Sequence, residues 1–128
     1  MVYGIVAKTE ILDKGEHLGF EYYILNLGTH PTAYVQIPKG HPCFELYRDS
    51  INIYVHGGLT YAKKYLVINN NEPIKGWFIG WDYAHYGDYT GFDEMYPIEF
   101  RAGGKKWTTK EIQEDVFEVC KQLKEMEK

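Results

Sequence analysis

Residues 108–126, TTKEIQEDVFEVCKQLKEM, contain the clearest structural signal in the chain. Thr108 and Glu111 have the spacing of a capping box, in which each side chain satisfies a free backbone N–H at the start of a helix. The apolar side chains that follow recur at helical spacing and form one stripe. They are Ile112, Val116, Val119, Cys120, Leu123 and Met126, with Phe117 at the edge. The opposite face is charged, so this stretch predicts a long helix that lies across one face of a sheet.

Short segments rich in β-forming residues precede this helix and predict the sheet. Ile51, Ile53 and Val55 alternate with polar residues, which is the pattern of a half-buried strand. The loop 69–73 separates two further apolar segments and so predicts a hairpin. We expect strands at 2–7, 20–25, 33–37, 51–56, 65–68 and 77–81. The expected fold class is α+β: an antiparallel or mixed β-sheet with one long C-terminal α-helix packed on it.

The composition is that of an ordinary globular protein. The 128 residues, 45% of them hydrophobic and 25% charged, suit a single domain over residues 1–128. No apolar run approaches the ~20 residues that cross a bilayer. The first residues lack the apolar stretch of a signal peptide, so we expect a cytoplasmic protein with no membrane partner. Cys43 and Cys120 have no zinc or disulfide-framework spacing and are expected to be reduced, mostly buried thiols.

Charge and aromatic content narrow the choice of ligand. The net charge of −4 argues against binding long DNA or RNA, because phosphate neutralisation supplies most of that affinity. A small anionic ligand needs only a few local donors and stays compatible with this charge. Twelve tyrosines raise the aromatic content to 16%. Tyrosine favours strands and also stacks on a base or a sugar, so composition leaves both uses open.

The first candidate motif is His56-Gly57-Gly58-Leu59-Thr60-Tyr61, at the end of an expected strand. Adjacent glycines let the backbone take positive φ and approach a ligand closely. Exposed N–H groups in such a loop can cradle an anion. A tight turn that happens to follow a histidine explains the same residues equally well.

The second candidate motif comprises Asp82, His85 and Asp88, which are three residues apart at the end of another expected strand. This spacing places side chains on one face of a helical turn. If the two strand ends lie side by side, His56 joins them in one cluster. Such a cluster is compatible with a metal site, with acid–base hydrolysis, or with a hydrogen-bonded scaffold for a binding loop. An H-E-x-x-H motif and a nucleophile elbow are absent, which weighs against a catalytic metal or a Ser or Cys nucleophile.

Residues of other types near these motifs favour a small polar ligand. Lys63, Lys64, Arg48 and Arg101 are close enough in sequence to supply phosphate donors, although a solvated surface explains each one singly. His30 and His41 precede prolines, which holds their backbones extended. We treat these two histidines as secondary candidates.

Four strings occur together in this chain: GTHPTAY at 28–34, PKGHP at 38–42, VHGGLTY at 55–61 and GWDxAHxGD at 80–88. Through them, residues 28–123 resemble a family of small phage and prophage proteins. Members of that family often have Phe and Cys where this chain has Trp81 and Tyr83. The resemblance implies a phage setting, in which small proteins without a catalytic signature often counter host defence. By analogy it points to sponges, compact proteins that sequester nucleotide immune signals.

The resulting hypothesis is a phage-type anti-defence protein that binds and sequesters a cyclic oligonucleotide or a cyclic ADP-ribose isomer. It assigns no catalytic residue, metal or cofactor. Tyrosines would stack on the base, and His56 with the Gly57 and Gly58 amides would meet phosphate or ribose. The expected ligand-binding residues are His56, Gly57, Gly58, Thr60, Tyr61, Asp82, His85, Asp88, Tyr54 and Tyr86. The same analogy implies a homo-oligomer in the host cytoplasm.

Two alternatives use the same sequence features. The first is a metal-dependent or His/Asp hydrolase that acts on a small phosphorylated or glycosidic substrate. The second is a protein inhibitor of a host enzyme, in which exposed tyrosines would form the hot spots of the interface.

Overall fold

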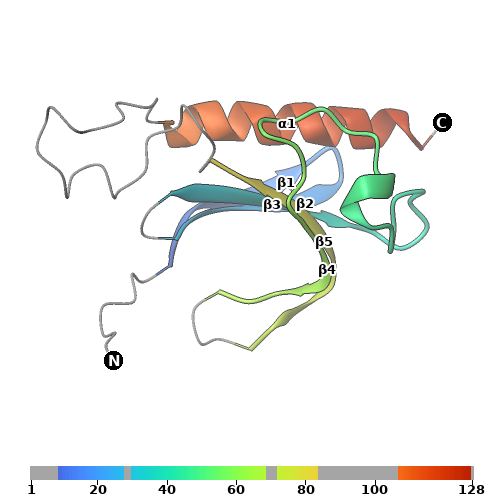
Figure 1. Ribbon diagram of the computed structural model, residues 1–128, viewed down its shortest axis with the longest axis horizontal. Helices are drawn as coiled ribbons and strands as arrows, with labels where there is room; N and C mark the ends of the chain where they lie inside the picture. Colours follow the sequence, from blue (N-terminus) through green and yellow to red (C-terminus); the bar gives the residue numbers. More distant parts are fainter. Residues whose placement is uncertain (1–8, 28–29, 69–71, 84–106, 128) are drawn as a thin grey trace, which may run out of the picture.

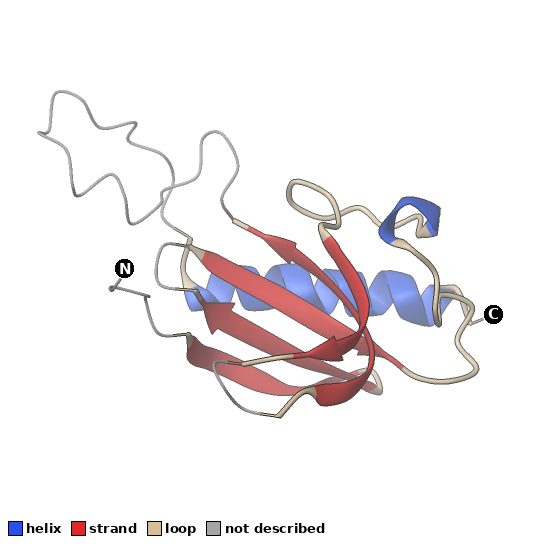
Figure 2. Ribbon diagram, turned by 60° about the horizontal axis from the view of Figure 1, so that its bottom comes forward, coloured by secondary structure: helices blue, strands red, loops and turns tan. Residues whose placement is uncertain are grey.

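The computed structural model describes residues 9–27, 30–68, 72–83 and 107–127. Within these ranges, one antiparallel sheet carries a long helix across one of its faces (Figure 1, Figure 2). The strands are β1 Glu10–His17, β2 Phe20–Asn26, β3 Pro31–Ile37, β4 Tyr61–Leu66 and β5 Ile74–Asp82. The helices are the short 3-10 turn η1 Arg48–Ser50 and the helix α1 Thr109–Glu125. The expected α+β class, with one long C-terminal helix on an antiparallel sheet, is confirmed.

The strands lie in the order β1-β2-β3-β5-β4, so β3 is the centre of the sheet. A two-residue turn joins β1 to β2. Leu18 and Gly19 have φ values of 54° and 91°, and two successive positive φ angles give the turn whose twist matches that of the flanking strands. β4 and β5 form the expected hairpin around residues 69–73, with bounds that begin earlier than expected on both strands.

The helix α1 begins as its sequence indicates. The Thr108 hydroxyl accepts from the backbone N–H of Glu111, and the Glu111 carboxylate accepts from the backbone N–H of Thr108, which completes the capping box. The expected buried face is confirmed, because Ile112, Val116, Val119, Cys120 and Leu123 are all fully buried. Among the described residues, no helix combines the length and the apolar character that a membrane span requires.

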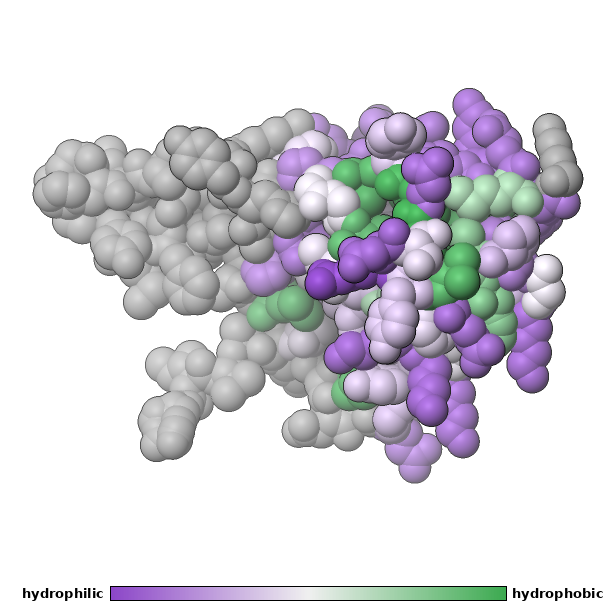
Figure 3. All heavy atoms as spheres, turned by 45° about the vertical axis from the view of Figure 1, so that its right-hand side comes forward, coloured by the Kyte–Doolittle hydropathy of each residue, from purple (hydrophilic) through white to green (hydrophobic). Residues whose placement is uncertain are grey.

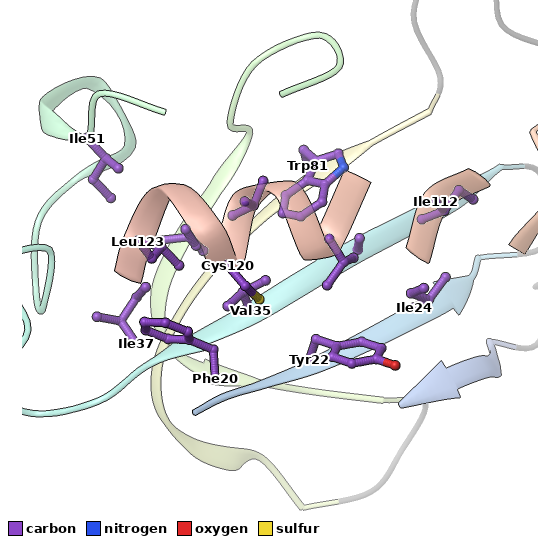
Figure 4. Packing of buried hydrophobic residues seen from close by; sticks show 14 of the residues in the cluster. Phe20, Tyr22, Ile24, Val35, Ile37, Ile51, Trp81, Ile112, Cys120 and Leu123 are labelled. Carbon is purple, nitrogen blue, oxygen red and sulfur yellow. The ribbon is translucent and has the colours of Figure 1, made fainter. Parts of the chain in front are cut away.

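The main core lies between α1 and the sheet. Side chains alternate along a strand, and one set from β2, β3 and β5 faces the helix. Figure 4 shows Phe20, Tyr22, Val35 and Trp81 from these strands lying against Cys120 and its neighbours on the helix. At the edge of this layer, the His17 ring stacks on Phe117 with centroids 3.9 Å apart. The stripe of α1 is therefore covered by the three central strands of the sheet.

The opposite face of the sheet has a smaller core of its own. Leu25, Leu66, Ile68 and Phe78 are buried there, with Tyr23, Tyr34 and Tyr61 packed around them. The β4–β5 hairpin curves over this face (Figure 1). A register shift accompanies the curve, since Gly76 and Trp77 together oppose Lys64. Such a β-bulge bends a strand and increases its twist. The second core thus forms because the outer hairpin bends away from α1.

Gly80 explains how the tyrosines of this second face fit together. It pairs with Tyr34 on β3 and with Tyr61 on β4. The two rings meet edge to face, with centroids 5.1 Å apart. A Cβ at position 80 would lie 2.5 Å from the Tyr34 ring. Glycine is therefore required here by the close approach of an aromatic ring.

The strand expected at 51–56 is wrong. This segment pairs with no strand among the described residues, and the Ile53 N–H donates to the Ile51 carbonyl at 3.1 Å, which forms a tight turn around Asn52. The Gln122 side chain on α1 takes the place of a strand: it accepts from the backbone N–H of Tyr54 and donates to the Tyr54 carbonyl, each at 2.8 Å. The alternation of apolar and polar residues nevertheless predicted the buried side chains, because Ile51, Ile53 and Val55 all pack against the main core.

Two further differences concern the N-terminal half. The strand expected at 2–7 lies outside the described residues. β1 was not expected, because its sequence EILDKGEH is polar and its side chains are mostly exposed. An edge strand with charged side chains is a common way to prevent pairing with other sheets.

The loop that follows β3 is fastened to the end of α1 by His41, which is only 6% exposed. The backbone N–H of Cys43 donates to Nδ1 of this ring at 2.9 Å. The proton therefore sits on Nε2, which donates to the carbonyl of Leu123 at 2.8 Å. That carbonyl lies in the last turn of the helix, where it also accepts a 3.2 Å bond from the backbone N–H of Met126. His41 is thus a helix-capping residue rather than the loop histidine of secondary interest that we expected.

Thr108→Ala should lower the free energy of unfolding by about 1 kcal/mol, because it removes the hydroxyl of the capping box. Urea unfolding followed by circular dichroism would measure this change. Thr109→Ala is the matched control, since Thr109 is the first residue of the helix and makes no capping contact. Equal losses in the two variants would contradict the capping role of Thr108.

Candidate functional site

His56 lies on the helix side of the sheet, within an aromatic cluster. Its ring stacks on Tyr83 with centroids 4.9 Å apart and planes 9° apart. The Trp107 ring, just before α1, lies 4.7 Å from His56 and 5.0 Å from Tyr83. We call His56, Tyr83 and Trp107 the aromatic cluster. It joins the end of the 51–56 segment, the end of β5 and the start of α1.

The Gly57-Gly58 pair forms a turn directly after His56. Both glycines have positive φ, 70° and 81°, as expected from the sequence. The N–H of Gly58 donates to the Val55 carbonyl at 2.9 Å, which closes a four-residue turn with positive φ at its third position. This N–H is therefore used within the turn, and the glycines are needed for the chain reversal that leads into β4.

The Tyr83 hydroxyl connects the aromatic cluster to the helix. It accepts from Nε1 of Trp81 at 2.9 Å and donates to the Asp115 carboxylate on α1 at 2.6 Å. Tyr83 is fully buried, so these bonds satisfy a hydroxyl that has no access to water. The sequence analysis noted Tyr83 only as a difference from the family pattern and did not identify Asp115. Neither residue carries a local motif that would have revealed the pair.

Asp82 lies on the other face of the sheet from His56. Side chains alternate along β5, and Trp81 and Tyr83 belong to the core under α1. Asp82 therefore faces away from the helix, toward Tyr34 on β3. Burial, and to a smaller extent the Asp82 carboxylate, raises the pKa of Tyr34. The described residues thus place Tyr83, rather than Asp82, against His56.

The other expected ligand-binding residues are dispersed. Tyr61 packs on the face away from α1, and burial raises its pKa to about 12. Thr60 is exposed just before β4, and its N–H donates to the Gly80 carbonyl at 2.9 Å. Tyr54 is 82% exposed and lies beside the helix. His85, Tyr86 and Asp88 lie outside the described residues. The expected residues that are described therefore do not form one site.

The β4–β5 hairpin offers a different candidate site. Lys64, Tyr65, Pro73 and Lys75 surround a groove of about 350 Å³, which we call the hairpin groove. Lys63 lies beside it, with Nζ 5.5 Å from the centre of the Tyr61 ring and 5.8 Å from that of Tyr65. Sequence reasoning named Lys63 and Lys64 as phosphate donors but missed Tyr65, Pro73 and Lys75. Tyr65 and Lys75 are direct cross-strand partners, in a register that the bulge at Gly76 shifts by one residue.

The described ranges contain no group of three or more His, Cys, Asp or Glu side chains placed to hold a metal ion. Cys43 and Cys120 are free and buried, as expected. Burial raises the pKa of both thiols, that of Cys120 to about 12. Neither thiol is therefore a ready nucleophile at neutral pH.

Comparisons of the chain with family models, with curated proteins and with solved structures found no match.

Tyr83→Phe should destabilise the protein by about 1–3 kcal/mol, because it leaves the Asp115 carboxylate and the Trp81 N–H without their shared partner. Chemical denaturation would measure the loss. Tyr47→Phe is the control, since Tyr47 is 74% exposed and should change stability by less than about 0.5 kcal/mol. A Tyr83→Phe protein as stable as the control would refute the structural role of this hydroxyl.

The stability should fall as the pH rises above 9. Burial raises the pKa of Cys120 from its ordinary value of 9.0 to about 12, so the unfolded chain loses this proton first. The contribution of the neutral Cys120 thiol to the free energy of unfolding is fully present below pH 9. It disappears as the pH approaches 12. Urea midpoints measured between pH 7 and 10 would test this. Cys120→Ala should show a smaller decline over this range, and an unchanged decline would disprove the assignment.

Proposed function

We propose that this protein binds and sequesters a small nucleotide-derived immune signal, a cyclic oligonucleotide or a cyclic ADP-ribose isomer, without transforming it. In this proposal it is a phage-type anti-defence protein that acts as a homo-oligomer in the host cytoplasm. The observation that carries the proposal is the composition of the hairpin groove, which combines two lysines with an aromatic ring and a proline.

The charges of the groove favour a phosphate-bearing ligand. Lys64 and Lys75 are both exposed at the groove, and Lys63 is next to it. These lysines make the surface of the hairpin basic on a chain whose net charge is −4, with a mainly apolar groove lining and with Lys63 and Lys64 extending from opposite faces of β4. Such a surface attracts a small polyanion, whereas the negative remainder of the molecule repels long nucleic acid.

The aromatic part of the groove favours a ligand with a base. Tyr65 is 39% exposed, so part of its ring is open to solvent. Stacking of a base on an aromatic side chain contributes about 1–3 kcal/mol and tolerates any base. Pro73 supplies a rigid apolar surface at the same groove. The volume of about 350 Å³ is within the range of small-molecule sites and matches roughly one nucleotide unit.

The glycine motif has an indirect part in this proposal. The turn at Gly57-Gly58 and the bond from Thr60 to Gly80 set where β4 begins. β4 then presents Lys63, Lys64 and Tyr65 in succession. The aromatic cluster at His56 therefore supports the start of the strand that carries the binding residues.

A capture-and-release experiment tests the proposal. The protein is incubated with a panel of cyclic oligonucleotides and cyclic ADP-ribose isomers, free ligand is removed by filtration, and the heat-denatured protein is analysed by chromatography. We expect one ligand to be depleted and then released intact. Lys64→Gln with Lys75→Gln should weaken its uptake by at least about tenfold, because two phosphate contacts are lost.

Lys39→Gln is the matched control, since Lys39 is an exposed lysine on a different loop. It should leave uptake unchanged. A chemically altered product would contradict sequestration and favour the hydrolase alternative. Lack of uptake across the panel would overturn the proposed function.

A further inference from the structure

A second groove lies where the 52–54 segment crosses the C-terminal half of α1. Its volume is about 480 Å³, larger than that of the hairpin groove. Figure 3 views the molecule from the side on which the C-terminal end of α1 lies, and hydrophobic side chains show there between hydrophilic ones. The lining residues are Asn52, Tyr54, Glu118, Gln122, Glu125 and Met126. We call this the helix groove.

Tyr54 is held in the helix groove with its ring in solvent. Both its backbone N–H and its carbonyl are bonded to the Gln122 side chain at 2.8 Å. Tyr54 is 82% exposed, the highest value among the large hydrophobic residues that the structure describes. A fixed backbone beneath an exposed ring reduces the entropy that a partner must remove on binding. An exposed tyrosine of this kind is a typical hot-spot residue.

The charge of the helix groove is negative. Glu118 and Glu125 are seven residues apart and so lie on one face of α1. Neither carboxylate is in an ion pair within the described ranges, and neither Lys nor Arg lines the groove. The adjacent Lys124 pairs instead with Glu127 at 3.1 Å. The groove therefore presents two carboxylates beside an aromatic ring, and the exposed Lys121 is their neighbour on the helix surface, three residues after Glu118 and four before Glu125.

We propose that the helix groove docks an arginine side chain from a protein partner with a basic surface segment. The guanidinium group would stack on Tyr54 and donate to the carboxylates of Glu118 and Glu125. The aliphatic part of the arginine would lie on Met126. Arginine suits this arrangement better than lysine, because a planar guanidinium can stack on a ring and bind a carboxylate with two parallel bonds. This surface is independent of the hairpin groove, whose charge is opposite.

The probe for this inference is a fluorescein-labelled octapeptide of alternating Gly and Arg, titrated with the full chain and followed by fluorescence anisotropy. We expect saturable binding that weakens with added salt. Glu118→Gln with Glu125→Gln should raise the Kd by at least about tenfold, and so should Tyr54→Ala. Tyr54→Ala keeps both backbone bonds to Gln122, and an unchanged Tm would show that the fold is intact.

Glu114→Gln and Tyr47→Ala are the matched controls. Glu114 is an exposed carboxylate on the same helix, and Tyr47 is an exposed tyrosine; neither lines the groove. Both variants should bind as the unmodified chain does. Equal weakening by Glu114→Gln would show diffuse attraction and overturn the proposed site. Equal binding of the corresponding Gly-Lys peptide would overturn the assignment to arginine, and no binding of either peptide would overturn the inference entirely.

Discussion

The apolar stripe of α1 is buried on β2, β3 and β5, and the polar contacts of the molecule are arranged around that burial. A large aliphatic side chain removed from water contributes roughly 1.5–3 kcal/mol, so the fully buried residues of the stripe dominate the tertiary stability. Each polar side chain that flanks the stripe then fixes a different segment. Gln113 donates to Asp13 on β1, Asp115 accepts from Tyr83 just after β5, and Gln122 binds the backbone of Tyr54. The helix is thus the common partner of three segments that are far apart in the sequence.

The sheet separates two kinds of surface, and this separation explains why the motif residues do not converge. On the helix side, His56 is packed against rings, and its neighbour Tyr83 uses its hydroxyl for structure. On the other side, the bend of the β4–β5 hairpin covers a small core and brings lysines to a groove. The helix groove, with Glu118 and Glu125, has the opposite charge. The described part of the chain therefore presents two surfaces that would select ligands of opposite charge.

The parts of the fold that depend on local sequence patterns were predictable. The parts that depend on contacts between distant segments of the chain were not. α1 was found because a capping box and a helical stripe are both local. The alternation at 51–56 reports burial alone, and the sequence does not reveal that Gln122 replaces a neighbouring strand. For the candidate site, the sequence indicates that Asp82 ends a strand but not which face it takes. Because side chains alternate between the two faces of a sheet, Tyr83 rather than Asp82 lies on the face where His56 packs. The hairpin groove depends on a bulge at Gly76, which a lone glycine suggests only weakly.

The position of α1 after all five strands also affects how the chain can acquire its structure. During synthesis, every strand that contributes to the main core emerges before the helix that covers it. The contacts of α1 with β1, β2 and β3 span roughly a hundred residues of sequence, as the bond from Gln113 to Asp13 illustrates. Long-range contacts of this kind slow folding, because a large loop must close before they form. Until α1 arrives, the apolar face around Phe20 and Val35 is open to water and to other chains. Until α1 has emerged, this apolar face would therefore be able to associate with other chains.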